Sequence, residues 1–342
     1  MRTALLCPAC LHEHATTVDR CTACRAEMRL DGRLTLRRLL GQGGSSRTFE
    51  AYDDVADRTV ALKMLDISKM TDWKRLELFK RQHTLLSSLD LPGVPDAYGM
   101  FEADTISGVQ WCFEQELIPG ETLQAQLDAG RRFTEAEGVA IFEDLLGTLG
   151  ALHALSPPLI HRDVKPSNLM LTPEDRAVLI DFDTATGDDQ DPFKRDATMV
   201  GTAGFVPLEQ LAGQAVPASD LYAAAMTLVA LLSRRPVTDL PVEGGRVLFE
   251  DALEVGDSLR YVLSRLLSPA SEERLQTTEE VLAALRAPVP ALTTGSALAT
   301  TGEVHNLAPD EMAALQWTSD RHLVWSVEAQ ASSRYSAGYS PD

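Results

Sequence analysis

The sequence lacks any apolar run of about 18 residues, the length that a helix needs to cross a bilayer. Basic residues are also scarce: 31 Lys and Arg stand against 50 Asp and Glu, for a formal net charge of -19. Phosphate-rich surfaces recruit Lys and Arg, so this balance argues against a general binder of nucleic acid or of anionic membranes. We therefore expect no membrane span and disfavour a nucleic-acid partner, which stays an alternative only for the cysteine-containing N-terminal segment.

Cysteine is scarce too, and its placement is uneven. The chain has five cysteines, of which four form two close pairs near the N-terminus and the fifth is Cys112. The stretch from Met1 to Leu6 is too short for a signal-peptide core before the cysteines begin, so we expect a reducing cytoplasm as the location. In that setting paired cysteines are typical of metal binding rather than of a disulfide framework.

The pairs have the spacing of a zinc ribbon: Cys7 and Cys10, then Cys21 and Cys24, each C-x-x-C. Four thiolates suit tetrahedral Zn²⁺, and a segment of this size cannot form a core without such a staple. A redox dithiol is the alternative, although it normally begins a helix in a larger fold. We expect the nearby His12 and His14 to be exposed loop residues, and Cys112 to be a small buried hydrophobe.

Composition divides the chain into three segments. Residues 1–29 carry the ribbon, residues 33–287 alternate strand-like and helix-like stretches, and residues 288–342 follow a Pro-rich junction. Apolar content of 44% and charged content of 24% are ordinary for a globular protein. For the last segment we expect a partly ordered extension lying on the preceding domain, with a docking or autoregulatory segment as the alternative.

The large segment begins with strands and continues with helices. Strand patterns cover residues 34–40, 59–65 and 109–118, and apolar residues at helical spacing cover 73–89. The longest helical patterns after them are 136–155 and 219–233. This order predicts an α+β fold with a small strand-rich part and a larger helix-rich part.

A dense group of polar residues follows the first long helix. His161 to Asn168 reads HRDVKPSN, and Asp181 follows an apolar strand at 177–180. Phosphoryl transfer needs this inventory: a carboxylate to orient the attacking hydroxyl, a cation for the moving group, and oxygen ligands for Mg²⁺. A glycine-rich stretch at 41–48 would let backbone N–H groups approach phosphate oxygens. The alternative is an ordinary α+β domain in which these residues are caps and solvated loops.

At these motifs, residues 33–287 resemble the eukaryotic-like protein kinase family, and more narrowly the bacterial serine/threonine kinases. The resemblance implies a two-lobed fold, with a five-stranded antiparallel sheet and one helix above a helical lobe. It implies ATP and Mg²⁺ as cofactors, beside structural Zn²⁺, and transfer of the γ-phosphoryl group to Ser or Thr of protein substrates. The implied catalytic residues are the base Asp163, the phosphoryl-neutralising Lys165, and the magnesium ligands Asn168 and Asp181.

The resemblance also implies the nucleotide and regulatory residues. Backbone groups of Glu116 and Ile118 would read adenine, and Lys63 would contact the α- and β-phosphates. Arg162 would pair with a phosphate that the enzyme adds to Thr198 by autophosphorylation, with Thr184 and Thr186 as weaker alternatives. Residues 201–205 resemble the substrate-binding end of the activation segment, Glu209 and Arg274 a bracing ion pair, and Asp220 a support of the catalytic loop. The full implied ATP-binding set is Leu40, Gly41, Gly43, Gly44, Thr48, Ala61, Lys63, Glu116 and Ile118.

Four positions depart from the family pattern. Ser46 replaces a glycine of the phosphate loop, and Gln82 replaces the glutamate that pairs with the strand lysine. Asp183 replaces the last glycine of the metal motif, which here is residues 181–183. Leu208 replaces the proline of a small-Pro-Glu triplet in a milder change. These losses raise the alternative of a pseudokinase, a nucleotide-binding scaffold with weak or no catalysis. We favour an active enzyme, because the groups with direct chemical roles all remain.

Two other phosphotransferase classes are disfavoured. A tyrosine kinase is disfavoured because Lys165 stands two residues after Asp163, as in serine/threonine kinases. A small-molecule kinase is disfavoured by the match of residues 201–209 to an activation segment.

Overall fold

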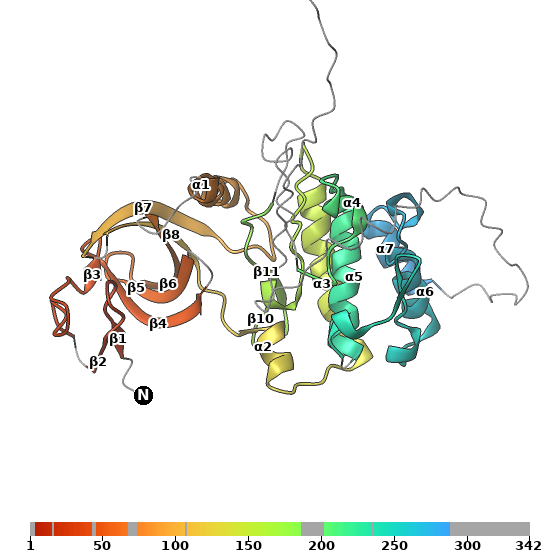
Figure 1. Cartoon of the computed structure of the whole chain (residues 1–342), viewed down its shortest axis with the longest axis horizontal. Helices are drawn as coiled ribbons and strands as arrows, with labels where there is room; N and C mark the ends of the chain where they lie inside the picture. Colours follow the sequence, from red (N-terminus) through yellow and green to blue (C-terminus); the bar gives the residue numbers. More distant parts are fainter. Residues whose placement is uncertain are drawn as a thin grey trace, which may run out of the picture.

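A computed structural model describes residues 4–15, 17–42, 46–67, 74–106, 108–185, 202–233 and 235–287. Figure 1 shows a strand-rich small lobe at one end and a helical lobe at the other, joined by the segment after β8. The order of strands and helices predicted from sequence therefore matches the architecture.

The small lobe is built on an antiparallel sheet with strand order β3-β4-β5-β6-β8-β7. Among the described residues, six strands form it rather than the five expected, because β3 of the cysteine-rich segment pairs with the edge of β4. Its strands are β3 (Arg29–Leu30), β4 (Leu34–Gln42), β5 (Ser46–Asp53), β6 (Arg58–Asp66), β7 (Ala97–Thr105) and β8 (Gly108–Glu116).

Side-chain alternation along β6 separates the two faces of this sheet. Leu62 and Met64 point into an apolar cluster shared with the cysteine-rich segment. Leu65 joins the other cluster, which contains Phe79 of helix α1 (Lys74–Ser87). Lys63 has the same parity as Leu65, so its side chain lies on the face that α1 covers.

The cysteine-rich segment is docked on the small lobe. Its hairpin of β1 (Leu5–Leu6) and β2 (Glu13–His14) packs with β1 against β4. Leu6 and Leu30 are 8% and 4% exposed in the same cluster as Leu34 and Leu36 of β4. Shared apolar burial and continuous strand pairing make the segment an integral layer of this lobe.

The helical lobe is centred on α5 (Pro217–Ser233), whose residues are almost all buried. A helix that is apolar on every side belongs in a core. Helices α3 (Glu135–His153) and α6 (Asp257–Leu266) pack against α5, and α7 (Thr278–Arg286) packs against α3 and α6 (Figure 1). Thr134 and Glu137 close a reciprocal capping box at the start of α3. The other elements of this lobe are β9 (Glu121–Thr122), α2 (Leu123–Asp128), β10 (Leu169–Leu171), β11 (Ala177–Leu179), α4 (Leu208–Leu211), β12 (Val242–Glu243) and β13 (Arg246–Val247).

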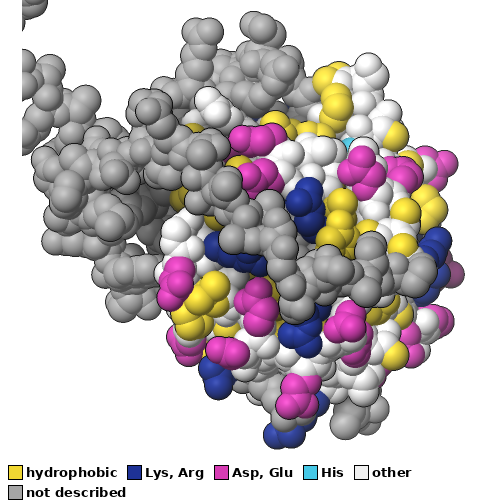
Figure 2. All heavy atoms as spheres, turned by 90° about the vertical axis from the view of Figure 1, so that its right-hand side faces the viewer, with side chains coloured by type: hydrophobic (Ala, Val, Ile, Leu, Met, Phe, Trp, Pro, Cys, Tyr) yellow, Lys and Arg dark blue, Asp and Glu magenta, His cyan; other side chains and the backbone are white. Residues whose placement is uncertain are grey.

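The surface of the helical lobe mixes both signs of charge. Figure 2 shows acidic, basic and apolar side chains interspersed over the face that it draws. Within the described ranges, every helix is too short or too polar to cross a bilayer.

Candidate active site

The loop between α3 and β10 brings the predicted catalytic groups together. The Asn168 amide donates to the backbone oxygen and to Oδ2 of Asp163, both at 2.9 Å. Lys165 Nζ lies 2.7 Å from Asp163 Oδ2 and donates to Thr202 Oγ1 at 2.7 Å. Thr202 in turn donates to Asp163 Oδ1 at 3.3 Å. One carboxylate is therefore held by an ammonium, an amide and a hydroxyl.

Asp220 of α5 fixes the backbone of this loop from below. Its carboxylate is fully buried and accepts from the backbone N–H groups of His161 (2.8 Å) and Arg162 (2.9 Å). These bonds hold Arg162 at a φ of 70°, a left-handed conformation that a non-glycine residue rarely adopts. A buried carboxylate that receives such bonds is a rigid anchor for the residues that follow.

The residue between the two aspartates of the metal motif anchors that motif in the core. Phe182 is 1% exposed and lies edge-on to the ring of His161, with centroids 4.7 Å apart. Burial lowers the pKa of His161, which keeps this packed imidazole neutral. Asp181 has a φ of 66°, so the chain turns sharply as it enters the motif.

Lys63 is surrounded by side-chain oxygens from two elements. Its Nζ lies 2.7 Å from both carboxylate oxygens of Asp183, 3.0 Å from Oδ1 of Asp181, and 3.3 Å from the amide oxygen of Gln82 on α1. Gln82 thus occupies the place of the missing helix glutamate, and Glu77 is exposed elsewhere on the same helix.

The charges of this group shift each other's titration. Burial alone would lower the pKa of Lys63, but Asp181 and then Asp183 raise it above its usual range. Burial would raise the pKa of Asp181, yet the ammonium of Lys63 keeps it below its ordinary value. Asp183 has its pKa raised to about 6, by partial burial first and by Asp181 beside it, against the charge of Lys63. Lys63 and Asp181 therefore stay charged near neutral pH.

The residues expected around a nucleotide lie where β4, β5, β6 and β8 meet. Gly41 pairs with Thr48 across the β4–β5 hairpin, and Thr48 pairs with Lys63 on β6. Ala61 is adjacent on β6, and Leu40 precedes Gly41 on β4. Glu116 ends β8 and donates its backbone N–H to Asp96, while Ile118 follows it, 9% exposed, in the link to the helical lobe. Gly43 and Gly44 lie outside the described residues.

Part of the expected activation segment is placed. Thr184 donates its hydroxyl to the backbone oxygen of His161 at 2.9 Å, which fixes the start of the segment. At its far end, Thr202 bonds Lys165 and Asp163 as described above. Thr198 and Gly201 lie outside the described residues.

The end of the segment is braced by an ion pair. Arg274, whose side chain is fully buried, places two nitrogens 2.6 and 3.0 Å from the two carboxylate oxygens of Glu209. Ser219 adds a hydroxyl bond to Glu209 at 2.7 Å. Burial would raise the pKa of Glu209, but the Arg274 and Ser219 bonds lower it. The carboxylate that follows Leu208 is therefore structural.

The four ribbon cysteines converge, with all their sulfur atoms within 4.8 Å of one another. The prediction that His14 is exposed is wrong. His14 is 6% exposed, and its Nε2 lies 3.4 Å from the sulfur of Cys21. Although burial raises the pKa of Cys21, the backbone N–H of Cys24 and the imidazole of His14 lower it to about 5. His12 is exposed and Cys112 is fully buried, as expected.

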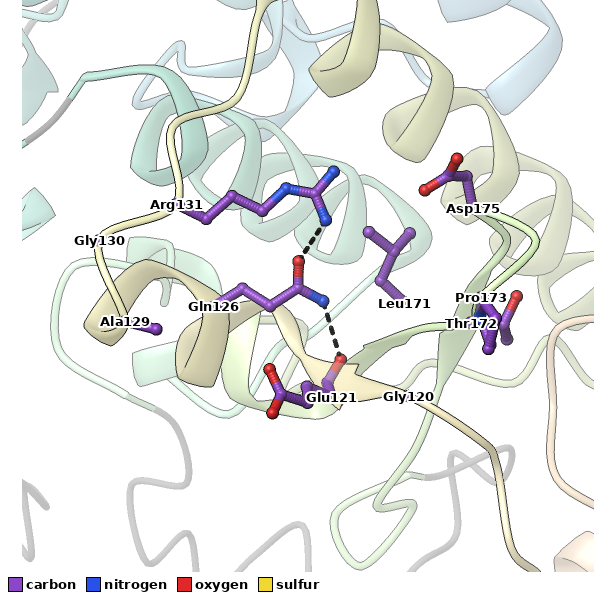
Figure 3. Close-up of a pocket in the computed structure, with 10 residues that line it drawn as sticks. All are labelled: Gly120, Glu121, Gln126, Ala129, Gly130, Arg131, Leu171, Thr172, Pro173 and Asp175. Atoms are coloured by element: carbon purple, nitrogen blue, oxygen red, sulfur yellow. Dashed lines mark hydrogen bonds between the residues drawn. The ribbon is translucent and has the colours of Figure 1, made fainter.

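A separate hollow of about 630 Å³ lies at the start of the helical lobe. Figure 3 shows Arg131 directed at Gln126, whose amide reaches the backbone oxygen of Glu121. Gly120 is required there, because a Cβ would lie 2.1 Å from the carbonyl oxygen of Leu171. None of the side chains that line it belongs to the catalytic loop, so the hollow is not the place of the chemistry.

Sequence reasoning missed two features of these sites. The first is the contact of Asp183 with Lys63, because a substitution in a motif does not reveal a partner 120 positions away. The second is the contact of His14 with the cysteine cluster. The signal available for it was the alternation of Glu13 and His14 in a short hairpin, which turns one side chain outward and the other inward.

Comparison with known proteins identifies the family to which most of this chain is similar. Residues 34–282 match the protein kinase domain model. The chain is 30% identical over 299 residues to serine/threonine-protein kinase B of Synechocystis sp.. The aligned region covers 82% of this chain and 51% of the relative. The chain is 33% identical to serine/threonine-protein kinase F of the same organism (78% and 57%) and 31% identical to serine/threonine-protein kinase PknA of Nostoc sp. (76% and 48%). The chain thus spans about half the length of these curated relatives. The chain belongs to the protein kinase family and, within it, to the bacterial serine/threonine kinases.

Proposed function

We propose that this protein is an ATP-dependent serine/threonine protein kinase that transfers the γ-phosphoryl group to hydroxyls of protein substrates, its own chain included. The observation that carries the proposal is the group of Asp163, Lys165, Thr202 and Asn168, assembled next to Asp181 and Lys63. The matching domain and the names of its relatives support it.

Each of these groups has a chemical task in such a transfer. Asp163 would accept a hydrogen bond from the attacking hydroxyl and orient its oxygen toward the phosphorus. Lys165, already in contact with that carboxylate, would neutralise charge on the moving group. Lys63 would hold the α- and β-phosphates, since its ammonium is fixed on a rigid strand.

The donor set suits Mg²⁺. The amide nitrogen of Asn168 is directed at Asp163, so its carbonyl oxygen is the atom that remains for a metal. Asp181 stays ionised beside Lys63 and would provide a second hard oxygen ligand. When bound, the ion would neutralise charge on the phosphates.

The ribbon suits one structural Zn²⁺. Four sulfur atoms within 4.8 Å of one another match the space around a tetrahedral ion with Zn–S near ~2.3 Å. His14 would donate its Nε2–H to the thiolate of Cys21, the kind of outer contact that orients a metal ligand. Four reduced thiolates fit a reducing compartment, and we propose the cytoplasm.

Control by phosphorylation is the remaining element. Arg162 is fixed next to Asp163, where a phosphate on Thr198 could pair with it and order the activation segment.

Incubation with labelled ATP and Mg²⁺, followed by mass spectrometry of the chain and of a generic protein substrate, tests the proposal. We expect phosphoserine or phosphothreonine, with one site on the chain between residues 184 and 208. A nucleotide-binding scaffold, the alternative to an active enzyme, would bind ATP and transfer nothing.

A further inference from the structure

The ion pair of the strand lysine is arranged unusually in this chain. Among the described side chains of helix α1, the one that contacts Lys63 is the neutral amide of Gln82, at 3.3 Å. The carboxylates come from the loop after β11, where Asp183 places both oxygens 2.7 Å from Nζ and Asp181 places one oxygen at 3.0 Å. A lysine that is 8% exposed needs such a counter-charge, because an unpaired buried ammonium is costly.

We infer that Asp183 is a positioning residue that replaces the missing helix glutamate as the counter-ion of Lys63. The inference rests on the proposed function, since its purpose is to hold Lys63 for the phosphates of ATP. The substitutions at positions 82 and 183 are then two halves of one change, in which the carboxylate has moved from α1 to the metal loop.

The backbone of the metal loop explains why two aspartates reach one lysine. Phe182 is buried in the core of the lobe, so its neighbours on either side are directed away from that core. The left-handed turn at Asp181 then presents Asp181 and Asp183 to the same ammonium.

The two aspartates have different tasks. Asp181, with one oxygen on Lys63 at 3.0 Å, is the expected magnesium ligand and must turn toward the ion when nucleotide binds. Asp183 contacts Lys63 through both oxygens and can keep that contact after Asp181 leaves. Its distance to Lys63 does not depend on where α1 lies, so the position of the helix has less control over the lysine than an ion pair from α1 would have.

Relocation of the carboxylate tests this directly. Asp183→Asn keeps the shape of the side chain and removes its charge, and Gln82→Glu returns a charge from the helix side. For wild type and each variant, the quantities to measure are the KM for ATP, kcat, the Mg²⁺ concentration for half-maximal rate, and the affinity for ATP·Mg²⁺ by calorimetry. Glu77→Gln, which removes an exposed carboxylate from the same helix without touching Lys63, is the matched control.

We expect Asp183→Asn to raise the KM and the Kd for ATP by about tenfold, the size that follows when a charge-assisted bond becomes neutral. Adding Gln82→Glu to it should restore both to within about threefold of wild type, because either carboxylate can serve the lysine. Glu77→Gln should change neither.

Three results would overturn the inference: an unchanged Kd in Asp183→Asn, a double variant no better than Asp183→Asn, or a rise confined to the Mg²⁺ requirement, which would make Asp183 a metal ligand. The side chain of Asp183 is 40% exposed, so the variants should fold. If Asp183→Asn does not fold, Asp183→Gly, which also lacks the carboxylate, repeats the test. Calorimetry keeps the outcome separate from catalysis: if wild type binds ATP and transfers nothing, the proposed function fails while the order of the Kd values still decides the role of Asp183.

Discussion

Leu6→Ala tests whether packing of the ribbon stabilises the sheet of the small lobe. Leu6 lies on β1, is 8% exposed, and belongs to the apolar cluster of the kinase sheet. Its neighbour Leu5 points the other way, into the small cluster around the cysteines. The two leucines therefore form a matched pair, one for the interface and one for the ribbon itself.

The magnitude follows from the burial of Leu6. Truncation of a buried leucine costs about 2–5 kcal/mol, and the lower part of this range applies where surroundings at the edge of a cluster can relax. A loss of about 2–3 kcal/mol in the opening free energy of the sheet corresponds to a rise of about 30- to 140-fold in the amide exchange rate, at a factor of ten per ~1.4 kcal/mol.

Hydrogen–deuterium exchange read out on peptides from β4 and β6 measures this effect locally, which avoids assuming one transition for both lobes. We expect faster exchange in both strands for Leu6→Ala. For Leu5→Ala we expect faster exchange only within residues 4–30. If Leu6→Ala leaves β4 and β6 as protected as in wild type, the ribbon is a tethered module and the reasoning from shared burial is wrong.

Two further predictions concern the metal and the ion pair that braces the helical lobe. Protein purified without added zinc should contain one zinc ion per chain, and Cys10→Ser should lose it; metal analysis that finds no zinc in wild type, or a native disulfide between Cys7 and Cys10, contradicts the site. Glu209→Gln should cost about 3 kcal/mol of stability at pH 7, because it leaves the fully buried charge of Arg274 without its partner. Since the folded-state pKa of Glu209 is lowered, wild type holds this stability above the unfolded-state pKa of about 4.3 and loses it as the pH falls through the folded-state value. Urea unfolding of wild type and Glu209→Gln between pH 7 and pH 3 should therefore show that their difference in unfolding free energy becomes smaller only in acid. A difference that does not depend on pH would contradict this assignment.

Contiguous motifs made the core of the active site predictable from the sequence. Asp163, Lys165 and Asn168 lie within six positions, so one loop conformation brings them together. The convergence of the four cysteines was predictable for a similar reason, since two C-x-x-C turns each fix two sulfur atoms locally.

Features that depend on packing between distant segments were not predictable in this way. The sixth strand of the sheet arises because β3 meets the edge of β4, and its length of two residues gives almost no periodic signal. The pairing of Asp183 with Lys63 depends on how the metal loop lies across the sheet. A residue-by-residue reading identified both substitutions, at positions 82 and 183, but only the fold shows that they face the same ammonium.

The most direct test of the central claim is the rate of phosphoryl transfer from labelled ATP by wild type beside Asp163→Asn. Asparagine keeps the shape of the side chain and removes the hydrogen-bond acceptor charge that orients the attacking hydroxyl. We predict measurable transfer to Ser or Thr by wild type and a loss of about 10²–10⁴-fold in the variant, with ATP affinity preserved. ATP binding by both proteins, with no transfer by wild type or with equal transfer by both, would contradict the account.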